Sequence, residues 1–409
     1  MSTQPTPPMR PWPLAAPPAD YVLGHVRAVL PDRVLDDARI TVRDGRIAEV
    51  GPHPAGAPSD VDGGGLLCLP GLVDTHSDAL ERERLPRPTA PLSWEFAIVS
   101  LEGKLRAAGV TTVFHGAGFQ HKTSRGLERT VATAAELCSC VRARGGTAVD
   151  HRILYRLDLR SAEGAAALRN ELSNADGVAL VSHEDHTPGQ AQYADRGYLE
   201  KYLVGTDGLT EEEARRHVDE LIADRARRLS VRDDNLAWLG ELARAGRIRL
   251  LGHDPDSAEA VAGLAARGGA VAEFPTTVAA ARAARDRGFP VVMGAPNVLR
   301  GGSHAGNVSA AEMIGQGLVT GLASDYLPSA LLGACFRLAR AGIVGLPEAV
   351  RLVTAGPAAV AGLPDRGSLL PGRRADLVMV DGGQWPAVRA VLPATSATLA
   401  TSAETAEQR

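Results

Sequence analysis

Eight apolar runs, each followed by polar residues and then by helical sequence, constrain the fold of this 409-residue chain more than any other feature. The runs are Leu66–Val73, Val110–Phe114, Thr147–Leu159, Val178–Ser182, Ile248–Leu251, Ala270–Phe274, Pro290–Met293 and Gly321–Ser324. This repeat is typical of parallel βα units, and eight units make a (β/α)8 barrel. We therefore predict an α/β fold with a TIM-like barrel. A doubly wound sheet is the alternative, because periodicity does not show closure.

Short β-forming segments lie on both sides of this repeat. Asp44-Gly45 between two apolar runs is a hairpin signal, and strands are also expected over Ala375–Val380 and Ala387–Val391. We predict that the two chain ends together form a small β-sandwich. The predicted parts are a proline-rich disordered tail (1–20), the first part of the sandwich (21–65), the barrel (66–362), the second part of the sandwich (363–392) and a flexible tail (393–409).

The connection after the fourth run is longer than a barrel needs. Residues 190–246 carry charged helical sequence, with a capping box at Thr210–Glu213 and a second helix expected over Asp234–Ala245. Because it follows a strand's carboxyl end, this insertion is a candidate lid or dimer element, and a solvated helical hairpin is the alternative.

The overall charge and the cysteines limit the classes of function. A net charge of -4 with a pI near 6.3 supplies no basic field for nucleic acid or a membrane surface. The proline-rich start lacks the apolar run of a signal peptide, and four cysteines fit a reduced compartment better than a disulfide framework. We expect a cytoplasmic protein that acts on a small molecule.

The first apolar run ends in two side chains that bind metals, His76 and Asp78. Side chains alternate across a strand, so these two share one face while Thr75 and Ser77 lie on the other. Both can therefore reach one cation at the strand's carboxyl end. A turn after a buried strand is the simpler interpretation of this triplet alone.

The other runs also end in ionisable groups, which should meet at one end of a barrel. They are His115, Asp158, His183, Glu184, Asp185, His186, His253, Asp254, Glu273 and Asp325. Imidazoles and carboxylates without thiolates suit one or two divalent ions, with zinc favoured over manganese or iron. The predicted metal ligands are His76, Asp78, Asp158, His186, His253 and Asp325.

Some of these groups have simpler explanations. His115 or His183 could hydrogen-bond a carbonyl group, and Asp254 could cap the next helix. Asp325 is the candidate general base, because a lone carboxylate after the last strand can hold a metal and accept a proton from water. A glycine-rich loop at Gly301-Gly302 could cradle an anion, with Arg300 as a forked donor to phosphate oxygens.

Several longer motifs carry a resemblance to a known family. LPGLVDTHSD (residues 69–78), the Asp325 strand and GSLLPGRRADLV (residues 367–378) resemble the amidohydrolase superfamily. HTPGQ (186–190), AEFPTT (272–277), MGAPNVLRGGSHAGN (293–307) and SDYLP (324–328) resemble its α-D-ribose 1-methylphosphonate 5-triphosphate diphosphatase branch, in the carbon–phosphorus lyase pathway. The resemblance covers about residues 20 to 392. It implies metal-dependent hydrolysis between the α and β phosphorus atoms, with release of pyrophosphate.

The substrate-binding residues expected from these motifs and from nearby cations are Gln190, Arg300, Gly301, Gly302, His304, Asn307 and Arg87. The chain departs from the branch at several positions of the predicted site. His115 and Asp158 stand where Asp and Glu are expected, Ala191 replaces Arg, and the sequence around His183 is richer in histidine.

Two other functions remain open. A C–N hydrolase acting on a cyclic amide or amidine would use the same scaffold, and a non-catalytic binding relative is the third possibility. Only the diphosphatase needs several cations around its pocket; the candidates are Arg82, Arg84, Arg87, Arg152 and Arg300. The expected partner is a phosphorylated small molecule, and a homodimer is also considered.

Overall fold

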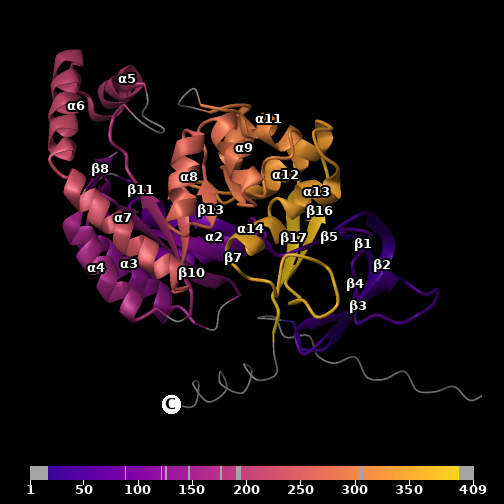
Figure 1. The fold of residues 1–409 in the computed structure, drawn as a ribbon. Helices are drawn as coiled ribbons and strands as arrows, with labels where there is room; N and C mark the ends of the chain where they lie inside the picture. The colour runs from indigo at the N-terminus through magenta and orange to yellow at the C-terminus, as the bar shows by residue number, and fades with distance from the viewer. Residues whose placement is uncertain are drawn as a thin grey trace, which may run out of the picture.

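The computed structural model describes residues 17–87, 89–120, 122–124, 127–145, 148–175, 177–189, 195–303 and 307–395. Its centre is a sheet of eight parallel strands in the order β6-β7-β10-β11-β12-β13-β14-β15 (Figure 1). The strands are β6 (Leu72–Ser77), β7 (Val110–Phe119), β10 (Asp150–Asp158), β11 (Ala179–Glu184), β12 (Ile248–His253), β13 (Val271–Glu273), β14 (Val291–Gly294) and β15 (Gly321–Ala323). The predicted (β/α)8 barrel is confirmed.

The barrel is closed where its last strand meets its first. Ser77 and Asp325 form a parallel β-bridge, in which the Asp325 N–H donates to the His76 carbonyl at 2.9 Å and the Asp78 N–H donates to the Asp325 carbonyl at 2.6 Å. Ser324 adds a side-chain link, because its hydroxyl donates to Oδ2 of Asp74 at 2.5 Å. Closure therefore holds the carboxyl ends of the first and last strands against each other.

Helices surround the barrel, and most follow a strand in the chain. They are α1 (Ala79–Arg84), α2 (Trp94–Ala107), α3 (Val131–Ala143), α4 (Ala162–Ser173), α7 (Leu229–Arg244), α8 (Ala258–Ala266), α9 (Val278–Asp286), α10 (Ala295–Arg300), α11 (Ala310–Gly315), α12 (Ala330–Arg340), α13 (Leu346–Arg351) and α14 (Ala355–Val360). A short hairpin of β8 (Lys122–Ser124) and β9 (Leu127–Arg129) follows β7.

The interior of the barrel has its own apolar layer, which shows which strand residues point inward. Phe114, Leu154, Leu180, Leu251 and Val292 form this layer with other buried side chains. Because side chains alternate, residues two positions further along each strand also point inward and lie nearer the carboxyl end. Polar side chains at those positions are therefore collected at one end of the barrel.

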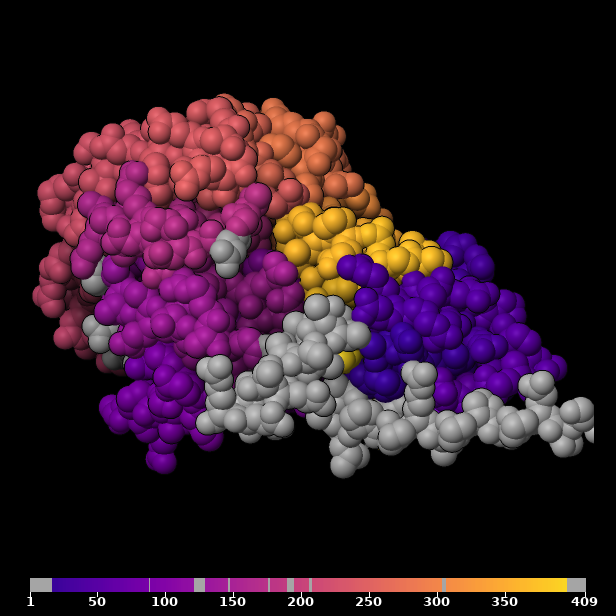
Figure 2. Space-filling view, turned by 90° about the horizontal axis from the view of Figure 1, so that it is seen from below, coloured from indigo at the N-terminus to yellow at the C-terminus, as the bar shows by residue number. Residues whose placement is uncertain are grey.

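The second sheet takes strands from both chain ends, as expected. Its strands are β1 (Tyr21–Val29), β2 (Val34–Arg43), β3 (Arg46–Pro52), β4 (Val61–Asp62), β5 (Leu67–Pro70), β16 (Leu377–Asp381) and β17 (Ala387–Leu392). They join in the order β17-β16-β5-β1-β2-β3, with β4 beside β1, around a separate core that includes Leu23, Ile40 and Leu377. The first and last parts of the described chain lie side by side in Figure 2. Asp44 and Gly45 both have positive φ, as a primed hairpin turn requires.

Two predicted strands differ most from the observed bounds. The run expected over Leu66–Val73 is divided at Gly71 into β5, which pairs in the second sheet, and β6, which pairs in the barrel. A Cβ at Gly71 would lie 2.0 Å from Oγ1 of Thr111, so a larger residue could not pass there. The second strand does not end at Phe114 but continues to Phe119.

The long connection after β11 forms three helices, of which α5 (Arg196–Asp207) and α6 (Glu211–Ala226) stand out from the barrel (Figure 1). The capping box at Thr210 and Glu213 is present. These helices share a small core of Leu199, Leu203, Ala214 and Val218, whereas α7 packs against the barrel. Within the described ranges, no helix is long and apolar enough to cross a membrane.

Candidate functional site

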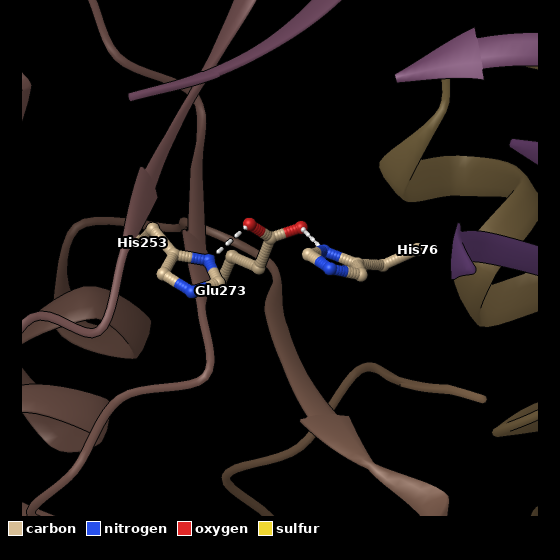
Figure 3. A group of neighbouring side chains, drawn as sticks. All are labelled: His76, His253 and Glu273. Carbon is tan, nitrogen blue, oxygen red and sulfur yellow. Dashed lines mark hydrogen bonds and ion pairs between the residues drawn. The ribbon is translucent and has the colours of Figure 1, made fainter. Parts of the chain in front are cut away.

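Two histidines from distant strands share one buried carboxylate at the carboxyl end of the barrel (Figure 3). Nδ1 of His76 lies 2.8 Å from Oε1 of Glu273, and Nδ1 of His253 lies 2.7 Å from Oε2. The Ser182 hydroxyl also donates to Oε2 of Glu273, at 2.6 Å. A carboxylate that accepts a hydrogen bond from the Nδ1–H group keeps the proton on Nδ1 and leaves Nε2 of each ring as the metal-binding atom.

The same contacts shift two pKa values. Burial alone would raise the pKa of Glu273, but the interactions with His76 and His253 outweigh it and hold that pKa well below its usual range. Burial lowers the pKa of His253, whereas Asp254 and Glu273 raise it more, to about 9. The site therefore has a strongly anionic character that a cation would neutralise.

Besides the cluster of His76, His253 and Glu273, the described residues form two further groups of possible metal ligands, and each of these includes one of the two histidines. The first is His76, Asp78 and Asp325, and the second is Glu184, His186 and His253. Within each group the ligand atoms lie within 4.8 Å of one another. Their imidazole and carboxylate atoms fit a divalent ion of the zinc, manganese or iron type. Of the predicted ligands, the structure thus brings His76, Asp78, His186, His253 and Asp325 to one end of the barrel.

Asp78 is held by two arginines. Arg156, a buried residue of β10, donates from Nη1 to Oδ1 of Asp78 at 2.8 Å and to Oδ2 at 3.0 Å, and Arg129 donates to Oδ2 at 2.9 Å. Burial alone would raise the pKa of Asp78, but Arg156 and Arg129 outweigh it and lower that pKa. Nη2 of Arg156 also donates to Oε2 of Glu184 at 2.8 Å. Arg156 therefore joins one carboxylate of each ligand group.

Three residues at the strand ends have positive φ although none is glycine: Asp254 (52°), Phe274 (53°) and Asp325 (56°). Such backbone is uncommon for residues with a Cβ and is often found at functional sites, where the surroundings enforce it. The backbone of Asp325 pairs with β6 through the bridge described above. Burial, and then repulsion from Asp78, raises the pKa of the Asp325 carboxyl group. A raised pKa makes this carboxylate a better proton acceptor.

Asp158, a predicted ligand, lies outside the possible ligand groups of the described residues, and its role as a ligand stays a prediction. Both carboxylate oxygens of Asp158 accept hydrogen bonds from Arg225 of α6, at 2.8 and 2.9 Å. Arg225 also donates to Asp185 at 2.9 Å, and Arg160 holds the other side of Asp185. Asp158 and Asp185 thus fasten the inserted helices to the barrel.

His115 and His183 lie outside the ligand groups. Nε2 of His115 lies 2.9 Å from Nδ1 of His151, whose Nε2 faces Glu102 of α2 at 3.3 Å, so this pair points outward between the strands and the helices. Burial, then His151, lowers the pKa of His115 well below its usual value. Burial is also the main reason that the pKa of His183 falls to about 4.

The glycine-rich loop is not the expected anion cradle in the described residues. The N–H groups of Gly301 and Gly302 both donate to the Asn297 carbonyl, at 3.1 Å, and so end helix α10 instead of facing a ligand. Arg300 is exposed and donates to the Tyr326 hydroxyl at 2.6 Å. Arg82 lies over the same ring, 5.0 Å from its centroid. Two cations therefore flank the residue that follows Asp325.

The other residues predicted to bind substrate are Arg87, Asn307, Gln190 and His304. Arg87 is exposed, and Asn307 is half-buried in the segment before α11. Gln190 and His304 lie outside the described residues.

Sequence reasoning missed two important groups, Arg156 and the orienting role of Glu273. Arg156 lies inside an apolar run, two residues before Asp158 and hence on the same face of the strand. This spacing is the feature of the sequence that predicts a place for Arg156 at the site. Glu273 was recognised as a strand-end group but not as the partner of two histidines.

Known proteins that are similar to this chain in sequence are hydrolases. A family model described as "Amidohydrolase family" matches residues 257–401. Over 365 residues the chain is 36% identical to α-D-ribose 1-methylphosphonate 5-triphosphate diphosphatase of Escherichia coli (strain K12), covering 88% of this chain and 94% of that protein. It is 28% identical over 378 residues to an imidazolonepropionase of Deinococcus radiodurans, covering 86% and 87%.

Solved structures share the fold at low sequence identity. An N-acetyl-D-glucosamine-6-phosphate deacetylase from Mycobacterium smegmatis has a TM-score of 0.59 and 19% identity, covering 92% of this chain and 98% of that chain. An enamidase has a TM-score of 0.57 and 16% identity, covering 92% and 95%. These structures support the architecture of a barrel with an attached sheet.

Proposed function

The chain belongs to the amidohydrolase family, and from this premise we propose that it is a metal-dependent diphosphatase that cleaves α-D-ribose 1-methylphosphonate 5-triphosphate and releases pyrophosphate. The observation that carries the proposal is the pair of arginines beside the proposed base. Arg300 and Arg82 both contact Tyr326, the residue directly after Asp325. A polyphosphate needs such cations next to the reacting centre, whereas a neutral amide does not.

The residues of the proposed site would have different roles in the reaction. When bound, a divalent ion supplies Lewis-acid activation of water and of the phosphoryl group. His76 in one ligand group and His253 in the other would each bind such an ion through Nε2, because Glu273 holds both Nδ1 atoms. Asp325 would accept the proton of the attacking water. Arg300 and Arg82 would neutralise phosphate oxygens and keep the phosphate chain in line.

The alternative is hydrolysis of a C–N bond in a cyclic amide, which the similarity to imidazolonepropionase supports. That reaction would use the same histidines and Asp325 but would leave Arg300 and Arg82 without a role in binding. Arg300→Gln separates the two functions. It should raise KM for a phosphorylated substrate and leave turnover of an amide unchanged.

Phosphorus NMR of metal-reconstituted protein tests the proposal. Ribose 1-methylphosphonate 5-triphosphate, ATP and a phosphate-free cyclic amide are incubated in parallel. We expect pyrophosphate from the ribosyl substrate and little or none from ATP. Opening of the amide without any phosphorus turnover would reject the diphosphatase and establish the C–N hydrolase.

A further inference from the structure

Asp254 directly follows His253 at the end of β12 and turns back toward it. In an extended strand the two side chains would point to opposite faces. The φ of Asp254 is 52°, and its N–H donates to the Glu273 carbonyl at 2.8 Å. As a result, Oδ2 of Asp254 lies 3.5 Å from Nε2 of His253 and 3.6 Å from Nε2 of His186. The backbone turn thus brings three possible ligand atoms together.

These distances do not describe ordinary hydrogen bonds. A charged imidazole–carboxylate pair would close to about 2.7–2.9 Å. Instead, Oδ2 of Asp254 is buried and accepts no hydrogen bond from any described residue, although Asp254 as a whole is only 6% exposed. A buried carboxylate oxygen without a partner is costly. Two ligands of a tetrahedral zinc ion, each about 2.1 Å from the metal, lie about 3.4 Å apart, close to the spacing seen here.

Capping of helix α8 does not explain Asp254. The N-cap of that helix is Ser257, whose side chain accepts the N–H of Ala260. The Asp254 carboxylate therefore does not cap helix α8, although its position in the sequence predicts a cap there.

The neighbouring carboxylate is already engaged. Oε2 of Glu184 accepts a hydrogen bond from Arg156, which is buried and also bound to Asp78. In the group of Glu184, His186 and His253, the negative charge of Glu184 is thus partly neutralised by Arg156. We propose that Asp254 is a metal ligand, and that it completes with His186 and His253 a divalent-ion site at the ends of β11 and β12. This inference rests on the proposed metal-dependent function.

Cobalt(II) titration followed by visible absorbance, with zinc competition against a chelator, tests the assignment without using activity. Asp254→Asn is the informative variant, because Asn also tolerates positive φ and keeps the shape of the side chain. Asp256→Asn, two residues further on, is the matched control. We expect Asp254→Asn to lose one equivalent of tightly bound cobalt, with affinity reduced at least about 100-fold, and to change the absorption bands. The control should bind as the wild type does.

Thermal unfolding of the metal-free proteins shows whether Asp254→Asn keeps its fold. If that variant is less stable, Asp254→Glu is titrated beside it, since a retained carboxylate should keep more of the cobalt affinity than the amide does; equal affinities of the two variants would count against the assignment. Wild-type affinity and spectrum in Asp254→Asn would overturn the assignment while leaving the proposed function intact. A wild-type protein that binds no cobalt would overturn both.

Discussion

Replacement of Glu273 by Gln should weaken metal binding by disabling one of the two histidines that it orients. The two oxygens of Glu273 accept hydrogen bonds from Nδ1 of His76 and Nδ1 of His253, at 2.8 and 2.7 Å. Gln offers one acceptor oxygen and one NH2 donor. The ring facing the NH2 group must present Nδ1 as an acceptor, which places its proton on Nε2, where a cation would bind.

Loss of one such partner typically costs about 10- to 100-fold in metal affinity, or about 1.4 to 2.7 kcal/mol. Competition with a chelator measures this loss, and thermal unfolding of the metal-free protein checks the fold. Ser182→Ala is the control, because it removes a hydrogen bond to Glu273 but no histidine partner, and its loss should be smaller than about tenfold. Unchanged affinity in Glu273→Gln would refute the orienting role, and a loss far above 100-fold would make Glu273 a ligand itself.

Three further predictions concern other parts of the structure. Asp325→Asn should lower hydrolysis by about 10²- to 10⁴-fold at unchanged stability, measured by pyrophosphate release, and near-normal turnover would exclude the base assignment. Asp158→Asn should leave metal affinity unchanged but lower the free energy of unfolding by about 1–3 kcal/mol, because it weakens the bonds to Arg225; a tenfold loss of metal affinity would restore Asp158 as a ligand. Burial lowers the pKa of both His115 and His151, so only the unfolded chain gains their protons below pH 6.5 and stability should fall as the pH falls. His115 has the pKa held well below its usual value, and one histidine that stays unprotonated in the folded protein accounts for about 1.4 kcal/mol between pH 7.5 and pH 5.5. His115→Gln should therefore reduce this loss in denaturant titrations at the two pH values; an equal loss would contradict the explanation.

Apolar periodicity was sufficient to predict the barrel and the end of it at which polar groups meet. Each strand's pattern is local, and parallel strands bring their carboxyl ends together whatever the helices between them do. His76, His253 and Asp325 were therefore predicted to be neighbours although about 250 residues separate the first from the last. The hairpin at Asp44-Gly45 was also predictable, because positive φ at two successive positions favours those residues.

The differences between the sequence-based expectations and the structure have non-local causes. Asp158 was expected to bind metal, but Arg225 reaches it from an inserted helix 67 residues further along the chain, and no local pattern indicates that contact. Gly301-Gly302 was interpreted as an anion cradle, although the same dipeptide also ends a helix, and only the position of the Asn297 carbonyl decides between them. The sequence after Asp254 predicts a helix start and hence a cap at Asp254, but the turn of Asp254 toward His253 depends on a hydrogen bond to the neighbouring strand β13, which no local pattern indicates.

Oxygen-18 labelling tests most directly the central claim that activated water at the barrel end attacks phosphorus. Metal-loaded protein is incubated in H2(18)O with ribose 1-methylphosphonate 5-triphosphate and, in parallel, with a phosphate-free cyclic amide, and the products are examined by phosphorus NMR and mass spectrometry. We predict one labelled phosphorus per turnover, in the 5-phosphate or in pyrophosphate, and no label without metal. Label that appears only in the carboxylate of an opened cyclic amide, with the triphosphate intact, would contradict the claim.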